Sequence, residues 1–111
     1  MVVPPSGRAH ILCTVRSAKD EKDAARHYEE AEEAFLAAIR TGDGRAALTA
    51  LADDVAAQAK AWNAAAYAAY HASEGEQRSA LDQVTERTEV LQQLWLDIAG
   101  AFHGRPALRD G

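Results

Sequence analysis

The sequence has little of what most binding and catalytic sites are built from. It has one cysteine among 111 residues, which excludes a disulfide scaffold. No run approaches 18 apolar residues, so no transmembrane helix is expected. The 12 basic residues are scattered and the net charge is -5, which argues against nucleic-acid binding driven by counterion release. No glycine-rich loop that could hold a phosphate is present.

Large apolar side chains are also fewer than the composition first indicates. Hydrophobic residues make up 48% of the chain, but 26 of them are alanines. Alanine adds little area to a core, so stability depends on few large side chains, each contributing roughly 1.5–3 kcal/mol when fully buried. These numbers predict one small soluble domain.

The N-terminal segment carries neither a signal peptide nor a clear strand. Residues 1–7 contain two prolines and predict an extended arm that is too short for a secretory signal. Residues 9–16 include a short β-branched run with no second strand to pair with, so we expect an additional helical segment there. The lone Cys13 fits a reducing compartment, and we expect a cytoplasmic protein.

Three long segments have the periodicity of helices. We expect the first helix over residues 17–40, with Ser17 and Asp20 as a capping box, and a turn at residues 41–44 in which Gly42 is left-handed and Asp43 caps the second helix. Its apolar stripe, at spacings of three and four, is Ala24, Tyr28, Ala31, Phe35 and Ala38.

The other two helices are expected over residues 44–72 and 76–103. Ser73 and Glu76 have the spacing of a capping box for the third helix, and Gly104 with Pro106 ends it. The stripe of the second helix is Leu48, Leu51, Val55, Ala59, Trp62, Ala66 and Tyr70. The stripe of the third is a strict heptad with one polar member: Leu81, Val84, Thr88, Leu91, Trp95, Ile98 and Phe102.

Short connections make consecutive helices antiparallel. The sequence therefore predicts an all-α, up-down-up three-helix bundle, with a short fourth helical segment at residues 9–16 as an option. The expected organisation is an extended arm at residues 1–7, a single helical-bundle domain at 8–104 and a short tail at 105–111.

An acidic run on the first helix suggests one enzymatic alternative. Glu29, Glu30 and Glu33, followed by Asp54 on the next helix, resemble the E-E-x-x-E and E-x-x-D motifs of the MazG-like nucleotide pyrophosphohydrolases. The resemblance implies Mg²⁺-dependent release of pyrophosphate from nucleotides with these four carboxylates as ligands. Leu51 stands where the second motif has glutamate, and the helical period places the carboxylates away from the apolar stripes.

Histidines and aromatic residues suggest two other kinds of site. His27 with Glu30, and His71 with Glu74, have the i, i+3 spacing of metal ligands, but two ligands do not make a site. We therefore predict no metal, no cofactor and no catalytic residue. A second alternative is a small-molecule-binding bundle with a pocket lined by Trp62, Tyr70 and Trp95, because bundles often hold ligands between facing helices.

The leading hypothesis comes from apolar residues that lie off the stripes. Tyr67 lies about 140° from the stripe of its helix, and Leu36 about 100° from that of the first helix. Leu94 and Leu96 flank the seam of the third helix. Helices that are apolar beyond one stripe usually bury a second face. These four residues thus predict a non-enzymatic protein that associates with another protein or with copies of itself, as a homo-oligomer or complex subunit, without membrane or nucleic acid.

Overall fold

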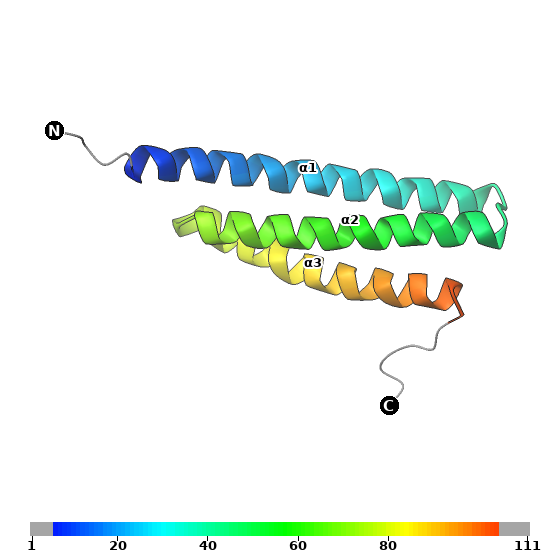
Figure 1. The fold of residues 1–111 in the computed structure, drawn as a ribbon. Coiled ribbons are helices and arrows are strands. Elements are labelled where there is room, and N and C mark those ends of the chain that lie inside the picture. Colours follow the sequence, from blue (N-terminus) through cyan, green and yellow to red (C-terminus); the bar gives the residue numbers. More distant parts are fainter. Residues whose placement is uncertain (1–5, 105–111) are drawn as a thin grey trace, which may run out of the picture.

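The structure, a computed structural model, describes the backbone of residues 6–104 and the side chains of residues 16–104. This part of the chain forms three helices and no strand: α1 (Ser6–Arg40), α2 (Arg45–Ala72) and α3 (Gly75–Phe102). The helices run up, down and up, and Figure 1 is viewed so that α2 lies between α1 and α3. The predicted three-helix bundle is confirmed. No helix in the described residues is long and apolar enough to cross a membrane.

Helix α1 begins earlier than the sequence pattern indicated. It starts at Ser6 and continues without a break through residues 9–16, so this segment is the first part of α1 and not a separate fourth helix. Ser17 lies inside the helix, and the predicted capping box with Asp20 is wrong. Serine costs only a few tenths of a kcal/mol in a helix interior, and the good helix formers around it outweigh that cost. Residues 1–5 of the predicted arm and the tail at 105–111 lie outside the described residues.

The turn between α1 and α2 is a Schellman motif. Gly42 has φ +74°, and its N–H donates to the Ile39 carbonyl at 3.1 Å while Asp43 N–H donates to the Ala38 carbonyl at 3.0 Å. A side chain at this φ would be strained, so the glycine ends α1 as predicted. Gly75, at the turn into α3, also has a positive φ of +62°, a conformation that a side chain would strain.

The predicted side-chain caps are absent. Gly44, which has no side chain, is the N-cap of α2. Asp43 instead accepts a hydrogen bond from Thr41 Oγ1 at 2.7 Å. Glu74, not Ser73, is the N-cap of α3. The Ser73 hydroxyl is buried and donates back to the Ala69 carbonyl at 2.7 Å, so it closes α2 and does not open α3.

The three predicted stripes meet in one core, but the helix pairs differ in how closely they approach. Helix α2 packs directly on both neighbours, whereas the Cα atoms of α1 and α3 nowhere come within 8 Å of each other. The buried alanines of α2 let its neighbours approach closely, and large rings span the wider gap between α1 and α3. The core comprises Tyr28, Ala31, Phe35, Ala52, Val55, Ala56, Ala59, Trp62, Trp95 and Ala99.

Candidate functional site

Aromatic side chains join α1 to α3. Phe35 of α1 contacts Trp95 and Phe102 of α3 edge-to-face, with ring centroids 5.2 and 5.8 Å apart. The indole N–H of Trp95 donates to the Tyr28 hydroxyl at 2.9 Å. The Tyr28 hydroxyl in turn donates to Glu32 Oε2 at 3.0 Å. Burial raises the pKa of Tyr28 to about 12, so this hydroxyl keeps its proton at neutral pH.

The indole N–H of the second tryptophan, Trp62, also has a hydrogen-bond partner. Trp62 of α2 packs against Tyr28 with ring centroids 5.3 Å apart, and its N–H donates to Glu21 Oε2 at 2.7 Å. The guanidinium of Arg87 lies 5.9 Å from the Trp62 ring centroid. A buried indole whose N–H has a partner fills the core without an energetic penalty. Trp62 and Trp95 are therefore structural side chains in this bundle.

The three aromatics proposed to line a ligand pocket lie in different surroundings. Trp62 and Trp95 are buried, whereas Tyr70 is half-buried near the turn between α2 and α3. Tyr70 lines an open hollow of about 370 Å³ with the first turns of α3, and the Arg78 guanidinium lies 4.6 Å from its ring centroid. Neither tryptophan borders this hollow. This hollow therefore does not join Tyr70 to the two tryptophans.

Polar contacts fix the seam between α2 and α3. Thr88, the polar member of the heptad, is fully buried; its hydroxyl accepts from Asn63 Nδ2 at 2.8 Å and donates to the Thr85 carbonyl at 3.1 Å. Sequence reasoning marked Thr88 as the exception in its stripe but did not find Asn63 as its partner. Asn63 lies one residue from Trp62 on a helix of alanines, and nothing in that pattern identifies the residue opposite.

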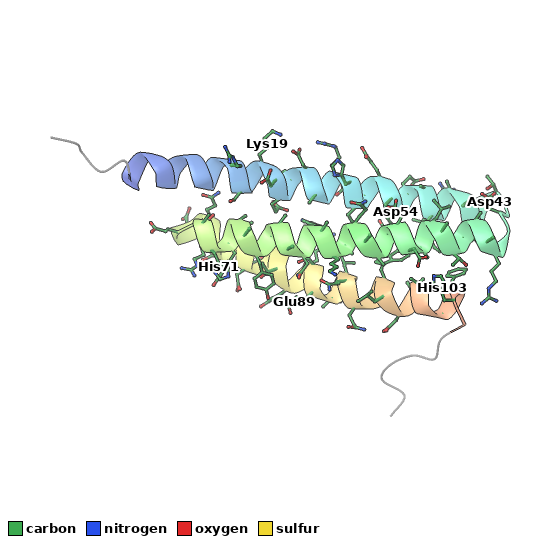
Figure 2. All side chains as sticks on the ribbon, in the orientation of Figure 1. Lys19, Asp43, Asp54, His71, Glu89 and His103 are labelled. Atoms are coloured by element: carbon green, nitrogen blue, oxygen red, sulfur yellow. The ribbon has the colours of Figure 1, made fainter. Side chains whose placement is uncertain are left out.

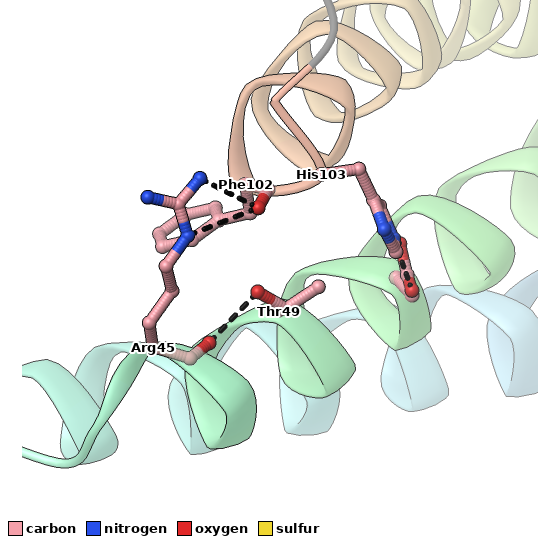
Figure 3. Close-up of polar contacts among 5 residues, drawn as sticks. Arg45, Thr49, Phe102 and His103 are labelled. Carbon is pink, nitrogen blue, oxygen red and sulfur yellow. Dashed lines mark hydrogen bonds and ion pairs between the residues drawn. The ribbon is translucent and has the colours of Figure 1, made fainter.

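The C-terminal end of α3 is tied to the start of α2 (Figure 3). Arg45 donates from Nη2 and Nε to the Phe102 carbonyl at 2.9 and 3.2 Å, which satisfies an oxygen that the helix end leaves free. His103 Nε2 lies 2.8 Å from Asp53 Oδ2. Both contacts are solvent-exposed and position the helix end.

The four carboxylates of the hydrolase resemblance all point to solvent. Glu29, Glu30, Glu33 and Asp54 are exposed. Glu33 pairs with Arg40 at 2.6 Å, and Asp54 accepts from Gln58 Nε2 at 3.3 Å. The described residues contain no group of three His, Cys, Asp or Glu side chains placed to hold a metal ion. The structure thus does not bring these carboxylates together as ligands.

Charged side chains are spread over all three helices, as Lys19 on α1, Asp54 on α2 and Glu89 on α3 show in Figure 2.

The two histidine–glutamate pairs are candidate metal ligands because of their i, i+3 spacing. His27 and His71 are exposed, and His71 packs against Tyr70 with ring centroids 5.4 Å apart. Glu30 lies on the same helix as His27, whereas Glu74 lies beyond the end of α2 as the N-cap of α3. The fold adds no third ligand to either pair in the described residues.

The four predicted interface residues are all exposed. The accessible fraction of each residue is 40% (Leu36), 37% (Tyr67), 46% (Leu94) and 45% (Leu96). Ile39 at 49% and Val90 at 68% are more exposed than these four and were missed. Ile39 follows Phe35 by one turn, so its position within the apolar pattern gave no sign of exposure.

The exposed residues divide between two faces. Leu94 and Leu96 flank buried Trp95 and point about 100° to either side of it. His103 lies two turns after Leu96 and contacts Asp53 of α2, so Leu96 lies on the side of α3 that borders α2. Leu94 lies on the opposite side, away from α2, and Val90 one turn earlier continues its row.

On α1, the buried alanines Ala31 and Ala38 face α2, because α3 approaches α1 only through long side chains. Viewed along α1, Leu36 lies about 80° from Tyr28 in the direction opposite to Ala31 and Ala38, so it points away from α2. Ile39 lies between Tyr28 and Leu36. We name the surface formed by Leu36, Ile39, Val90 and Leu94 the α1–α3 face. Tyr67 and Leu96 belong to the α2–α3 face.

Comparison with protein-family models, curated proteins and solved structures finds no match. The site that the geometry offers is a surface and not a cleft. Among the predicted interface residues, Leu36 and Leu94 share that surface, and their role in an interface stays a prediction.

Proposed function

We propose that this protein is a non-enzymatic helical bundle that acts by association, as an assembly subunit or small adaptor that binds another protein or further copies of itself. The observation that carries the proposal is the α1–α3 face. Four large apolar side chains lie exposed there, directly beside a core whose aromatic groups are already packed and hydrogen-bonded.

Such a face is costly in water and useful in a complex. Removing apolar surface from water contributes roughly 25 cal/mol per Å², and contiguous exposed apolar patches commonly mark interaction sites. Acidic and basic residues border the apolar side chains: Glu29 and Glu32 lie on α1, and Arg87 lies on α3. An apolar centre with a polar rim is the usual anatomy of a protein–protein interface.

The polar groups of the bundle support a non-catalytic role. Burial raises the pKa of Tyr28, yet its hydroxyl is held between Trp95 and Glu32 and stabilises the core. The single cysteine fits a reducing compartment, so a cytoplasmic location is part of the proposal.

Photo-cross-linking in the cells that produce the protein tests this function. A photoreactive amino acid at position 36 or 94 should give a discrete adduct with a protein, identified by mass spectrometry. The same group at position 93, an exposed residue of α3 off the α1–α3 face, is the matched control and should give none. Equal labelling at all three positions, or no adduct at 36 and 94, would contradict the proposal.

A further inference from the structure

A second heptad runs along α1 beside the buried stripe, and it bears on what the α1–α3 face binds. Its positions follow spacings of four and three residues, which place them on one side of the helix. Three members are charged and exposed or half-buried, two are half-buried alanines, and two are exposed apolar residues. In order, they are Ala18, Lys22, Ala25, Glu29, Glu32, Leu36 and Ile39.

The charges on this heptad are separated along the helix. The positive charge, Lys22, lies in the N-terminal half, whereas Glu29 and Glu32 lie in the C-terminal half next to Leu36. A parallel, in-register pair of such helices would place like charges opposite each other at all three positions, which is unfavourable. An antiparallel pair can instead place Lys22 of each copy opposite Glu32 of the other.

We infer that two copies of this chain form a symmetric dimer through antiparallel pairing of their α1 helices along this heptad. The inference rests on the proposed function and names its partner. With the two-fold axis beside residue 27, Ala18 lies opposite Leu36 of the second copy, and Lys22 lies opposite Glu32. In the same register Ala25 lies opposite Glu29, where a small residue lets the two helices approach.

The rest of the face fits the same occupant. Helices α1 and α3 do not approach each other directly on the side away from α2, and Leu94 lies exposed along this side. A helix of the second copy laid along α1 there covers Leu94 as well as Leu36. Each end of the pairing then brings Ala18 of one copy against Leu36 of the other, with the Lys22–Glu32 pairs between the two ends.

Charge reversal tests the pairing. Lys22→Glu should place acidic residues opposite each other at two symmetric positions and raise the dimer dissociation constant about tenfold or more. Lys60→Glu, which reverses an exposed lysine on α2, is the matched control and should leave the constant within about twofold. Sedimentation velocity over a concentration series measures both, and thermal melts establish that each variant is folded.

Mixing two variants gives a rescue that misfolding cannot imitate. Glu32→Lys should also weaken self-association, although it removes the acceptor of the Tyr28 hydroxyl. An equimolar mixture of Lys22→Glu and Glu32→Lys restores an acidic–basic pair at both symmetric positions and should form a heterodimer. Failure of the mixture to associate, with both chains folded, would overturn the pairing.

Cysteine pairs test the orientation, in a Cys13→Ser background. Ala18→Cys combined with Leu36→Cys should oxidise to a covalent dimer, because the two positions are opposed. Ala18→Cys alone should not, since its two copies lie about 27 Å apart along the antiparallel pair, far beyond the reach of a disulfide. Cross-linking by the single variant would show a parallel pair and contradict the inference.

The outcomes separate this inference from the proposed function. A wild-type chain that stays monomeric at millimolar concentration overturns the dimer. If positions 36 and 94 still cross-link to a different protein in cells, association stands and only its partner was wrong. If they cross-link to nothing, the proposed function fails as well.

Discussion

The two seams that flank the exposed faces are built from different chemistry. The α2–α3 seam is held by hydrogen bonds at fixed positions: Asn63 to Thr88 in the middle, and Arg45 to the Phe102 carbonyl at the end. The α1–α3 seam is held by rings, with one hydrogen-bonded link through Trp95 and Tyr28. Hydrogen bonds fix the register of two helices, whereas rings can span two helices that do not touch.

This difference explains where apolar surface is left over. Rings that bridge a wide gap fill its centre and leave the outer edges of α1 and α3 uncovered, where Leu36, Ile39, Val90 and Leu94 lie. Of the six large exposed apolar residues among the side chains described, only Tyr67 and Leu96 lie beside the closely packed α2–α3 seam. The wide seam is therefore the one suited to an additional helix.

The largest expected effect is on the ring-bridged seam. Trp95→Ala removes the ring that contacts Phe35 and donates to Tyr28, and leaves a cavity. We expect a loss of about 3–5 kcal/mol in the free energy of unfolding. Urea denaturation measures it, with Gln93→Ala on the exposed side of α3 as a control that should change stability by less than about 0.5 kcal/mol. A loss below about 1 kcal/mol would show that the ring does not join the helices.

The polar seam should respond differently to single and double replacement. Thr88→Val removes the acceptor of the Asn63 amide and should cost about 1–3 kcal/mol, because a desolvated donor is left without a partner. Asn63→Leu combined with Thr88→Val removes both polar groups and should recover most of that loss. A double variant as unstable as Thr88→Val would indicate that the hydrogen bond is not what makes the seam sensitive.

Tyr28→Phe tests the link between the two kinds of seam, at neutral and at high pH. Losing the hydroxyl should cost about 1 kcal/mol near pH 7. Because the pKa of Tyr28 is raised from 10.0 to about 12, the unfolded chain loses this proton first, and stability falls as pH rises from about 10 to about 12. The difference in stability between the wild type and Tyr28→Phe should therefore shrink over that range, as followed by denaturation at each pH. A constant difference would contradict the shift.

The smallest effect is expected at the exposed end of the polar seam. Arg45→Ala removes the donor to the Phe102 carbonyl, and because the contact is exposed, water can replace it. We expect less than about 1 kcal/mol of destabilisation, with faster amide exchange confined to the last turn of α3. Faster exchange throughout α3 would mean that this contact holds the whole helix.

The helices and their buried stripes could be predicted because they depend on local periodicity. Thr88 was recognised as a polar member of its stripe, and Gly42 as a left-handed helix end, from sequence alone. The side-chain caps at Ser17, Asp43 and Ser73 could not, because alternative hydrogen bonds within a few residues are close in energy. Ser73, for example, bonds back to Ala69.

The candidate surface could be predicted only in part. Distance from a stripe identified Leu36 and Leu94 as exposed, but also Tyr67 and Leu96, which lie on the other face. Which residues share a face depends on how α3 is placed relative to α1, and no local pattern contains that information. Ile39 shows the same limit, since the apolar pattern of α1 does not distinguish it from buried Phe35 one turn earlier.

The most direct test compares one substitution on the two faces. Leu36→Arg and Leu96→Arg place the same charge at leucines of similar exposure, 40% and 45%. Light scattering during size-exclusion chromatography should show a dimer for the wild type and for Leu96→Arg, and a folded monomer for Leu36→Arg. A dimer that survives Leu36→Arg and is lost in Leu96→Arg would place the interface on the α2–α3 face and contradict the account.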